Sequence, residues 1–238
     1  MLEGHISKAF DAGLAALHIR VLEMGGLVLD QVREAARAYS EWNVAAAYHV
    51  SDREGAVAGY AATINEDQFT LIARRQPVAS DLRAINALAK CAAELERADV
   101  ESRKIARTVL QQTGRPLRGT SADVRHLAQL AALLLRHSLE ALDRLDDAVA
   151  TEVIARDQEL DAEYAGGLRR LITRAMEDPR SLEVAIEAAF VLKSLERIGD
   201  HARNIARQTK LIAPEAQRAA GGSAVERSAA DSDPTAPF

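Results

Sequence analysis

Apolar and polar residues follow one another along most of this chain with the period of an α-helix. Between residues 153 and 175, apolar side chains recur every three or four positions, at Val153, Leu160, Tyr164, Leu168, Leu171, Ile172 and Ala175. No window shows the period-two alternation of β-branched residues that indicates a strand. The pattern therefore predicts an all-α fold.

Capping residues and helix breakers divide the chain into six helical stretches. Ser40 and Asp178 suit N-cap positions, and Pro77 and Pro179 suit first helical positions. The pair Gly25-Gly26 either weakens the first helix locally or permits a close approach between helices. We expect helices at about His5–Tyr39, Ser40–Gln76 and Pro77–Gln112, a fourth capped by Thr120 or Ser121, a fifth from a short polar break near Asp146-Asp147 to Glu177, and a sixth from Pro179 to about residue 212.

The two halves of the chain resemble each other. Residues 94–107 read "ELERADVESRKIAR" and residues 194–207 read "SLERIGDHARNIAR", a repeat at about 100 residues. Between the halves, the segment "TGRPLRGTSAD" is rich in helix breakers. We predict two similar three-helix bundles, at residues 1–113 and 120–212, and a disordered tail at 213–238, where apolar residues are sparse.

Composition narrows the environment and the partners. The net charge of −5 argues against nucleic acid as a main partner, because such binding needs a basic surface. Cys91 is the single cysteine, so no intrachain disulfide can form, and a reducing compartment is expected. We see neither a signal peptide nor a window of about 18 apolar residues. These features predict a cytoplasmic protein that meets a membrane only through partners.

Two pairs of acidic residues fall on apolar stripes. Glu196 and Asp200 lie four residues apart within "LERIGDHARNIA", and Asp157 and Asp161 do so within "DQELD". At 100° per residue, each pair occupies one helix face, and that face is the one occupied by apolar side chains. The sequence thus predicts four carboxylates that point inward from two neighbouring helices.

Four such carboxylates cannot all remain ionised in a dry interior, because each unpaired charge costs several kcal/mol. Three arrangements relieve that cost. The carboxyl groups can share protons at raised pKa values, pair with Arg156, Arg197 or Arg203, or bind a hard cation or iron through oxygen ligands. The coincidence of two acid pairs on apolar stripes favours the metal.

Several of these segments also carry a family resemblance. The motifs "LERIGDHARNIA", "ARDQELDAEY", "MEDPRSLEVA", "IARRQPVASDLRAI" and "VLEMGGLV" resemble the PhoU family of phosphate-uptake regulators over about residues 5–210. The resemblance implies a pair of three-helix bundles, each with acidic motifs for a metal cluster of iron or zinc, with magnesium or manganese as alternatives. It also implies a homodimer that negatively regulates the phosphate regulon. Its expected partners are the ATPase of a phosphate ABC transporter and a sensor histidine kinase.

Carried over by position, the family's acidic motifs are complete only in the second half, at Asp157, Asp161, Glu196 and Asp200. In the first half, Glu54 and Glu96 open the motifs, but Ala58 and Val100 stand at the closing positions. We therefore expect the first bundle to lack the cluster, or to bind metal weakly through Glu54, Glu96, Asp99 or Asp52.

The leading hypothesis is a non-enzymatic regulator with a metal site in its second bundle. The histidines show no metal-ligand spacing, Cys91 reads as a core residue, and no Gly-rich phosphate loop is present. Two alternatives remain. One is a metal-dependent enzyme with a carboxylate di-metal site, and the other is a dimerising helical scaffold in which the acids pair with arginines.

Overall fold

Seven α-helices and one 3-10 turn make up the part of the chain that the structure describes. The structure is a computed structural model, and it describes residues 3–75, 79–111 and 120–230. Those ranges contain no strand, which confirms the all-α prediction. The elements are α1 (Glu3–Glu41), α2 (Val44–Asp52), α3 (Glu54–Arg75), α4 (Ala79–Gln111), α5 (Thr120–Arg144), α6 (Asp147–Glu177), the 3-10 turn η1 (Pro179–Ser181) and α7 (Leu182–Ala230).

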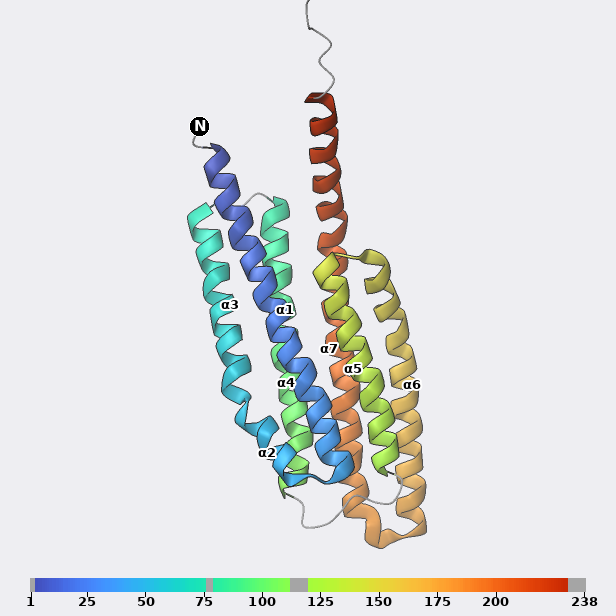
Figure 1. Ribbon diagram of the computed structural model, residues 1–238. Helices are drawn as coiled ribbons and strands as arrows, with labels where there is room; N and C mark the ends of the chain where they lie inside the picture. Colours follow the sequence, from blue (N-terminus) through green and yellow to red (C-terminus); the bar gives the residue numbers. More distant parts are fainter. Residues whose placement is uncertain (1–2, 76–78, 112–119, 231–238) are drawn as a thin grey trace, which may run out of the picture.

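The helices form two bundles that lie side by side (Figure 1). The first contains α1, α2, α3 and α4, and the second contains α5, α6 and α7. Helices α4 and α7 pack along each other, as do α1 and α5, so that one continuous apolar core extends through both bundles. The sharing of this core holds the two halves together as one body.

A matching turn joins the first two helices of each bundle. Trp42 and Leu145 have φ angles of 53° and 51°, the left-handed conformation that ends a helix. The residue after each turn is the cap of the next helix: Asn43 accepts from the amide of Ala46 at 3.1 Å, and Asp146 accepts from that of Ala148 at 2.9 Å. The internal repeat seen in the sequence is therefore also present in the backbone.

Three helix boundaries differ from the sequence prediction. Ser40 lies inside α1 and is not a cap, because Asn43 satisfies the first amides of the next helix. The expected second helix is divided near Arg53, which separates α2 from α3. The backbone of α7 continues to Ala230, past the ends of its neighbours (Figure 1), whereas a disordered tail was expected from residue 213. The segment is rich in alanine, the strongest helix former.

Other boundary predictions are confirmed or lie outside the described residues. Asp178 accepts from the amide of Arg180 at 3.1 Å and begins η1, with Pro179 in its first turn. The expected helix start at Pro77 and most of the linker after residue 112 fall outside the described ranges.

Helix α1 is long and apolar enough between Phe10 and Glu41 to cross a membrane, a feature that the sequence analysis did not predict. In the fold, its apolar face packs against neighbouring helices: Leu17, Val21 and Met24 are fully buried. At Gly25, a Cβ atom would lie 2.9 Å from Leu139 Cδ1, so that glycine permits the close contact with α5. Inside the structure 33% of this apolar window is buried, so core packing accounts for part of the hydropathy of α1.

Candidate metal and ion-pair site on α6 and α7

The four predicted metal ligands occupy one region of the α6–α7 packing, with unequal exposure. Asp157 is 2% exposed and Glu196 is 9% exposed, as expected for an inward face. Asp200 is half-buried, and Asp161 is exposed, which contradicts the prediction that all four point inward. The acidic stripe lies at the edge of the contact between α6 and α7. Residues four apart differ by about 40° around the helix axis, so Asp157 is covered by the neighbouring helix whereas Asp161 is open to solvent.

The same edge position explains why other members of the expected apolar stripes are open to solvent. Ile172 on α6 is 53% exposed. On α7, Leu182 and Ile186 share the helix face of Glu196 and Asp200 at 100° per residue, and they are 52% and 49% exposed. A helical wheel gives the angle of each side chain but not how far the neighbouring helices cover that angle.

Gly199 brings the two helices together beside the acids. A Cβ atom on Gly199 would collide with the side chain of Leu160 on α6 and would lie 3.6 Å from Asp157 Oδ1. The absence of a side chain lets α7 approach α6 at this level. This contact buries Asp157 against the backbone of α7.

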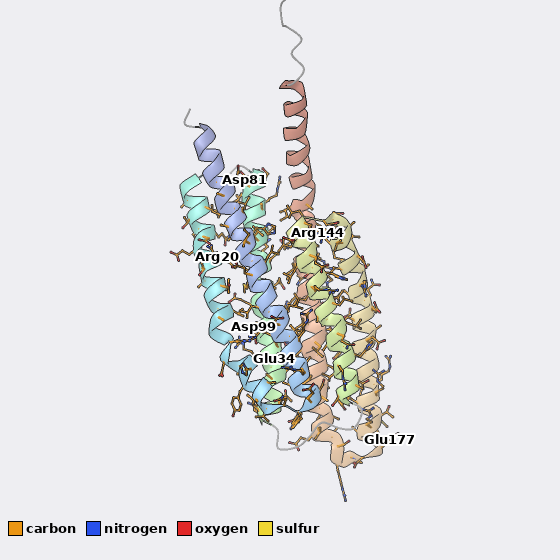
Figure 2. The ribbon with its side chains drawn as sticks, in the orientation of Figure 1. Arg20, Glu34, Asp81, Asp99, Arg144 and Glu177 are labelled. Atoms are coloured by element: carbon orange, nitrogen blue, oxygen red, sulfur yellow. The ribbon has the colours of Figure 1, made fainter. Side chains whose placement is uncertain are left out.

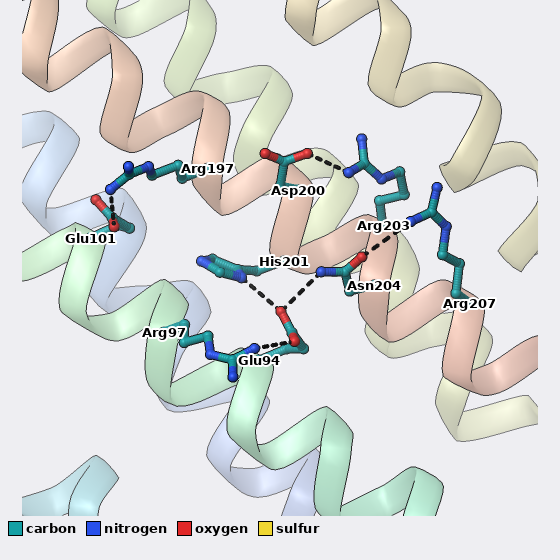
Figure 3. A network of polar contacts seen from close by, with 9 residues as sticks. All are labelled: Glu94, Arg97, Glu101, Arg197, Asp200, His201, Arg203, Asn204 and Arg207. Carbon is teal, nitrogen blue, oxygen red and sulfur yellow. Dashed lines mark hydrogen bonds and ion pairs between the residues drawn. The ribbon is translucent and has the colours of Figure 1, made fainter.

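Arg203 bridges Asp157 and Asp200. One terminal nitrogen of its guanidinium pairs with Asp157 Oδ2. The other lies 2.6 Å from Asp200 Oδ1, and Figure 3 shows this contact. Of the three arginines considered from the sequence, this is the one that pairs with the acids. Arg197 instead pairs with Glu101 at 3.3 Å, and Arg156 lies 3.6 Å from Glu152 on its own helix.

Glu196 is held separately from the other acids. Lys193 Nζ lies 2.6 Å from Glu196 Oε1 and 5.3 Å from the centre of the Tyr164 ring on α6. Burial alone would lower the pKa of Lys193, but Glu196, Tyr164 and Asp200 together outweigh it, so its pKa is raised. The lysine therefore remains charged beside Glu196.

Asp157 is the most perturbed carboxyl of the site. Its pKa is raised, first by burial and then by the nearby charges of Asp161 and Asp200, although Arg203 opposes the shift. Asp157 Oδ1 and Glu196 Oε2 are buried without a hydrogen-bond partner within the described part of the chain. Two acceptor atoms thus remain available for a cation.

The four acidic residues offer the donor atoms that a hard metal ion prefers, because each side chain ends in carboxylate oxygens. Their present positions do not form a metal cage, because no group of three acidic, histidine or cysteine side chains in the described residues converges on one point. The guanidinium of Arg203 stands between Asp157 and Asp200, so a metal ion bound there would have to displace it.

The corresponding region of the first bundle is a groove between α3 and α4 with a volume of about 370 Å³. Alanines dominate its walls, and Glu96 is its one acidic residue. Ala58 also lines it, Val100 is 39% exposed, and Asp99 lies inside the bundle (Figure 2), where it accepts from Gln31 at 3.1 Å. Weak metal binding by the first half, including Glu54 and Asp52, stays a prediction.

Sequence reasoning missed a polar network between the two bundles (Figure 3). Glu94 on α4 pairs with His201 Nδ1 at 2.7 Å, accepts from Asn204 at 3.1 Å and pairs with Arg97 at 2.6 Å. His201 thus points away from the acids, as its position on the helix predicts. The repeated "LER" and "IAR" motifs signalled that α4 and α7 correspond, but only packing shows that their polar faces meet.

Comparison with known proteins identifies the family. The family model described as the PhoU domain matches residues 21–109 and 124–209, most of both bundles. The chain belongs to the PhoU family. A relative named phosphate-specific transport system accessory protein PhoU homolog, from Pseudomonas aeruginosa, is 39% identical over 207 residues, 86% of this chain and 85% of its own length.

Further PhoU proteins are similar over the same extent. The phosphate-specific transport system accessory protein PhoU of Escherichia coli is 34% identical over 204 residues, 86% of this chain and 85% of its own. The crystal structure of PhoU from P. aeruginosa superposes with a TM-score of 0.83 at 36% identity, covering 87% of this chain and 99% of that one. A PhoU structure from Streptococcus pneumoniae, at 24% identity and a TM-score of 0.79, shares the fold.

Proposed function

We propose that this protein is a non-enzymatic, cytoplasmic regulator of phosphate uptake that acts on a phosphate transport system through protein contacts. The observation that carries the proposal is the match of both bundles to the PhoU domain, together with accessory proteins of phosphate transport that are similar over most of their length. In this role it represses the phosphate regulon as a homodimer that links the ATPase of a phosphate ABC transporter to a sensor histidine kinase.

A reporter assay tests this role. The host is a bacterium that lacks its own PhoU-family protein and carries a reporter under a phosphate-starvation promoter. In phosphate-rich medium, expression of this chain should reduce the reporter to the level that the host's own protein gives. A reporter that stays fully active, while the chain is folded and abundant, would refute the regulatory role.

We further propose that the acids of α6 and α7 bind a metal ion, with iron or zinc as the first candidates. This ion would replace the contacts that Arg203 makes with Asp157 and Asp200. The unpaired buried oxygens of Asp157 and Glu196 support this proposal. The alternative, a metal-free scaffold, is supported by the bridge that Arg203 makes between Asp157 and Asp200. When bound, the ion would supply positive charge to the carboxylates.

Elemental analysis distinguishes the metal site from the metal-free scaffold. Protein purified without chelator should contain metal, and Asp161→Ala and Asp200→Ala should lose it, whereas Asp143→Ala, an exposed aspartate on α5, should retain it. Metal that remains in both site variants, or wild type that stays metal-free after supplementation, would leave the ion-pair scaffold as the better account.

A further inference from the structure

A second charged site lies on the other contact between the bundles, where α1 meets α5. A groove of about 400 Å³ opens there, within the size range of small-molecule sites. It shares no residue with the acids of α6 and α7, so a ligand in this groove would bind independently of the proposed metal. Its lining contains two arginines from each helix, Arg33, Arg37, Arg125 and Arg136, and a single acid, Glu41.

The arginines belong to one continuous surface. Arg33 and Arg37 are one turn apart on α1, and Arg125 and Arg136 stand about three turns apart on the same face of α5. At about 1.5 Å per residue, the two α5 arginines are separated by roughly 16 Å along the helix axis. Positive charge therefore extends along the groove, over a length greater than one phosphate group.

The arginines are not committed to strong partners. Arg33 lies 3.7 Å from Asp30, Arg37 lies 3.4 Å from Glu34 and Arg136 lies 3.6 Å from Glu140, all within their own helices. Such long, exposed pairs contribute about 0–1 kcal/mol each and are easily exchanged. Arg125 makes no ion pair within the described residues.

Part of the groove lining is apolar. Ala36, Ala128 and Ala132 are buried there, and Leu133 also lines the groove. Ser40 and Gln129 add neutral hydrogen-bonding groups to the lining. Guanidinium groups bind phosphate oxygens in pairs of parallel hydrogen bonds, so that this arrangement suits phosphoryl groups on the rim above a flat apolar surface.

We propose that the α1–α5 groove binds a small ligand with two or more linked phosphoryl groups. The ligand can be inorganic polyphosphate or a nucleoside polyphosphate, since both present the same chain of phosphoryl oxygens. The lining of the groove contains four arginines and one acid, and a bound ligand would exchange its phosphoryl oxygens for the contacts of three of these arginines with Asp30, Glu34 and Glu140.

Titration calorimetry at fixed salt, with tripolyphosphate, magnesium-free ATP and orthophosphate as probes, tests the site. Tripolyphosphate should bind the wild type at least 10-fold more tightly than orthophosphate. The variants Arg125→Gln and Arg136→Gln should each weaken it at least 10-fold. Gln129→Glu adds a negative charge at an exposed position and removes no native charge, and it should also weaken the binding of tripolyphosphate.

Two control variants make the result specific. Arg169→Gln removes an exposed arginine on α6, and Arg197→Gln removes one from the α4–α7 surface, and neither should change the affinity. Absence of heat with tripolyphosphate up to millimolar concentration, equal affinity for orthophosphate, or weakening by Arg197→Gln alone would overturn the proposal. Within the proposal, equal binding of ATP and tripolyphosphate identifies the phosphoryl chain as the ligand, and tighter binding of ATP identifies a nucleotide.

Discussion

Removal of the Arg203 guanidinium tests how the acids of α6 and α7 are neutralised. In Arg203→Met, the aliphatic part of the side chain is kept, while Asp157 and Asp200 lose their shared cation. The Asp157 side chain is 3% exposed, so its charge would remain in a poorly solvated position. Loss of one partner of a fully buried ion pair costs about 3–5 kcal/mol.

The expected loss is smaller here, because solvent reaches part of the network. The side chains of Arg203 and Asp200 are 23% and 33% exposed. We expect Arg203→Met to lower the free energy of unfolding at pH 7 by about 2–3 kcal/mol. Urea denaturation of chelator-treated protein measures this, with Arg207→Met as the control. Arg207 is an exposed arginine on the same helix, 3.4 Å from Asn204, so its loss should cost less than about 0.5 kcal/mol.

The pH dependence gives an independent check. The pKa of Asp157 is already raised in the folded protein, and it should rise further without Arg203. A carboxyl with a raised folded pKa destabilises the fold when ionised, and this penalty disappears as the pH falls below the folded pKa. The deficit of Arg203→Met should therefore shrink as the pH falls from 7 through the raised folded pKa of Asp157. Equal stability of the two variants at pH 7, or a deficit that does not change with pH, would refute this account.

Three further predictions concern other parts of the fold. Gly199→Ala should lower the free energy of unfolding by about 1–3 kcal/mol in the same urea assay, since its Cβ atom meets Leu160; an unchanged value would contradict the close contact. Cys91 should react with a thiol reagent only after unfolding, because burial raises its thiol pKa to about 12. Glu101→Gln should cost about 1 kcal/mol at pH 7. Burial raises the pKa of Glu101, but hydrogen bonds from Lys104, Ser194 and Arg197 outweigh it and lower that pKa, so this loss should fade as the pH falls through the lowered folded pKa.

Local signals in the sequence were sufficient for most of the helical architecture. The helical period of apolar residues predicted the all-α fold, and the Asp178-Pro179 pair marked the start of the last helical segment. Ser40 was the expected cap, but the preceding helix continues past it to Glu41, and Asn43 caps the next helix. Trp42, in the left-handed conformation, lies between the two helices.

At the acidic site, too, the sequence determined some features and the tertiary structure determined others. The sequence by itself determined that Asp157, Asp161, Glu196 and Asp200 occupy matching faces of two helices, because residues four apart always share a face. Tertiary structure alone decided which of them are buried and which cation neutralises them. Helix periodicity defines an angle around the helix axis, whereas burial depends on how closely a neighbouring helix approaches that angle. At this site Gly199 sets that approach, and Asp161 lies beyond it.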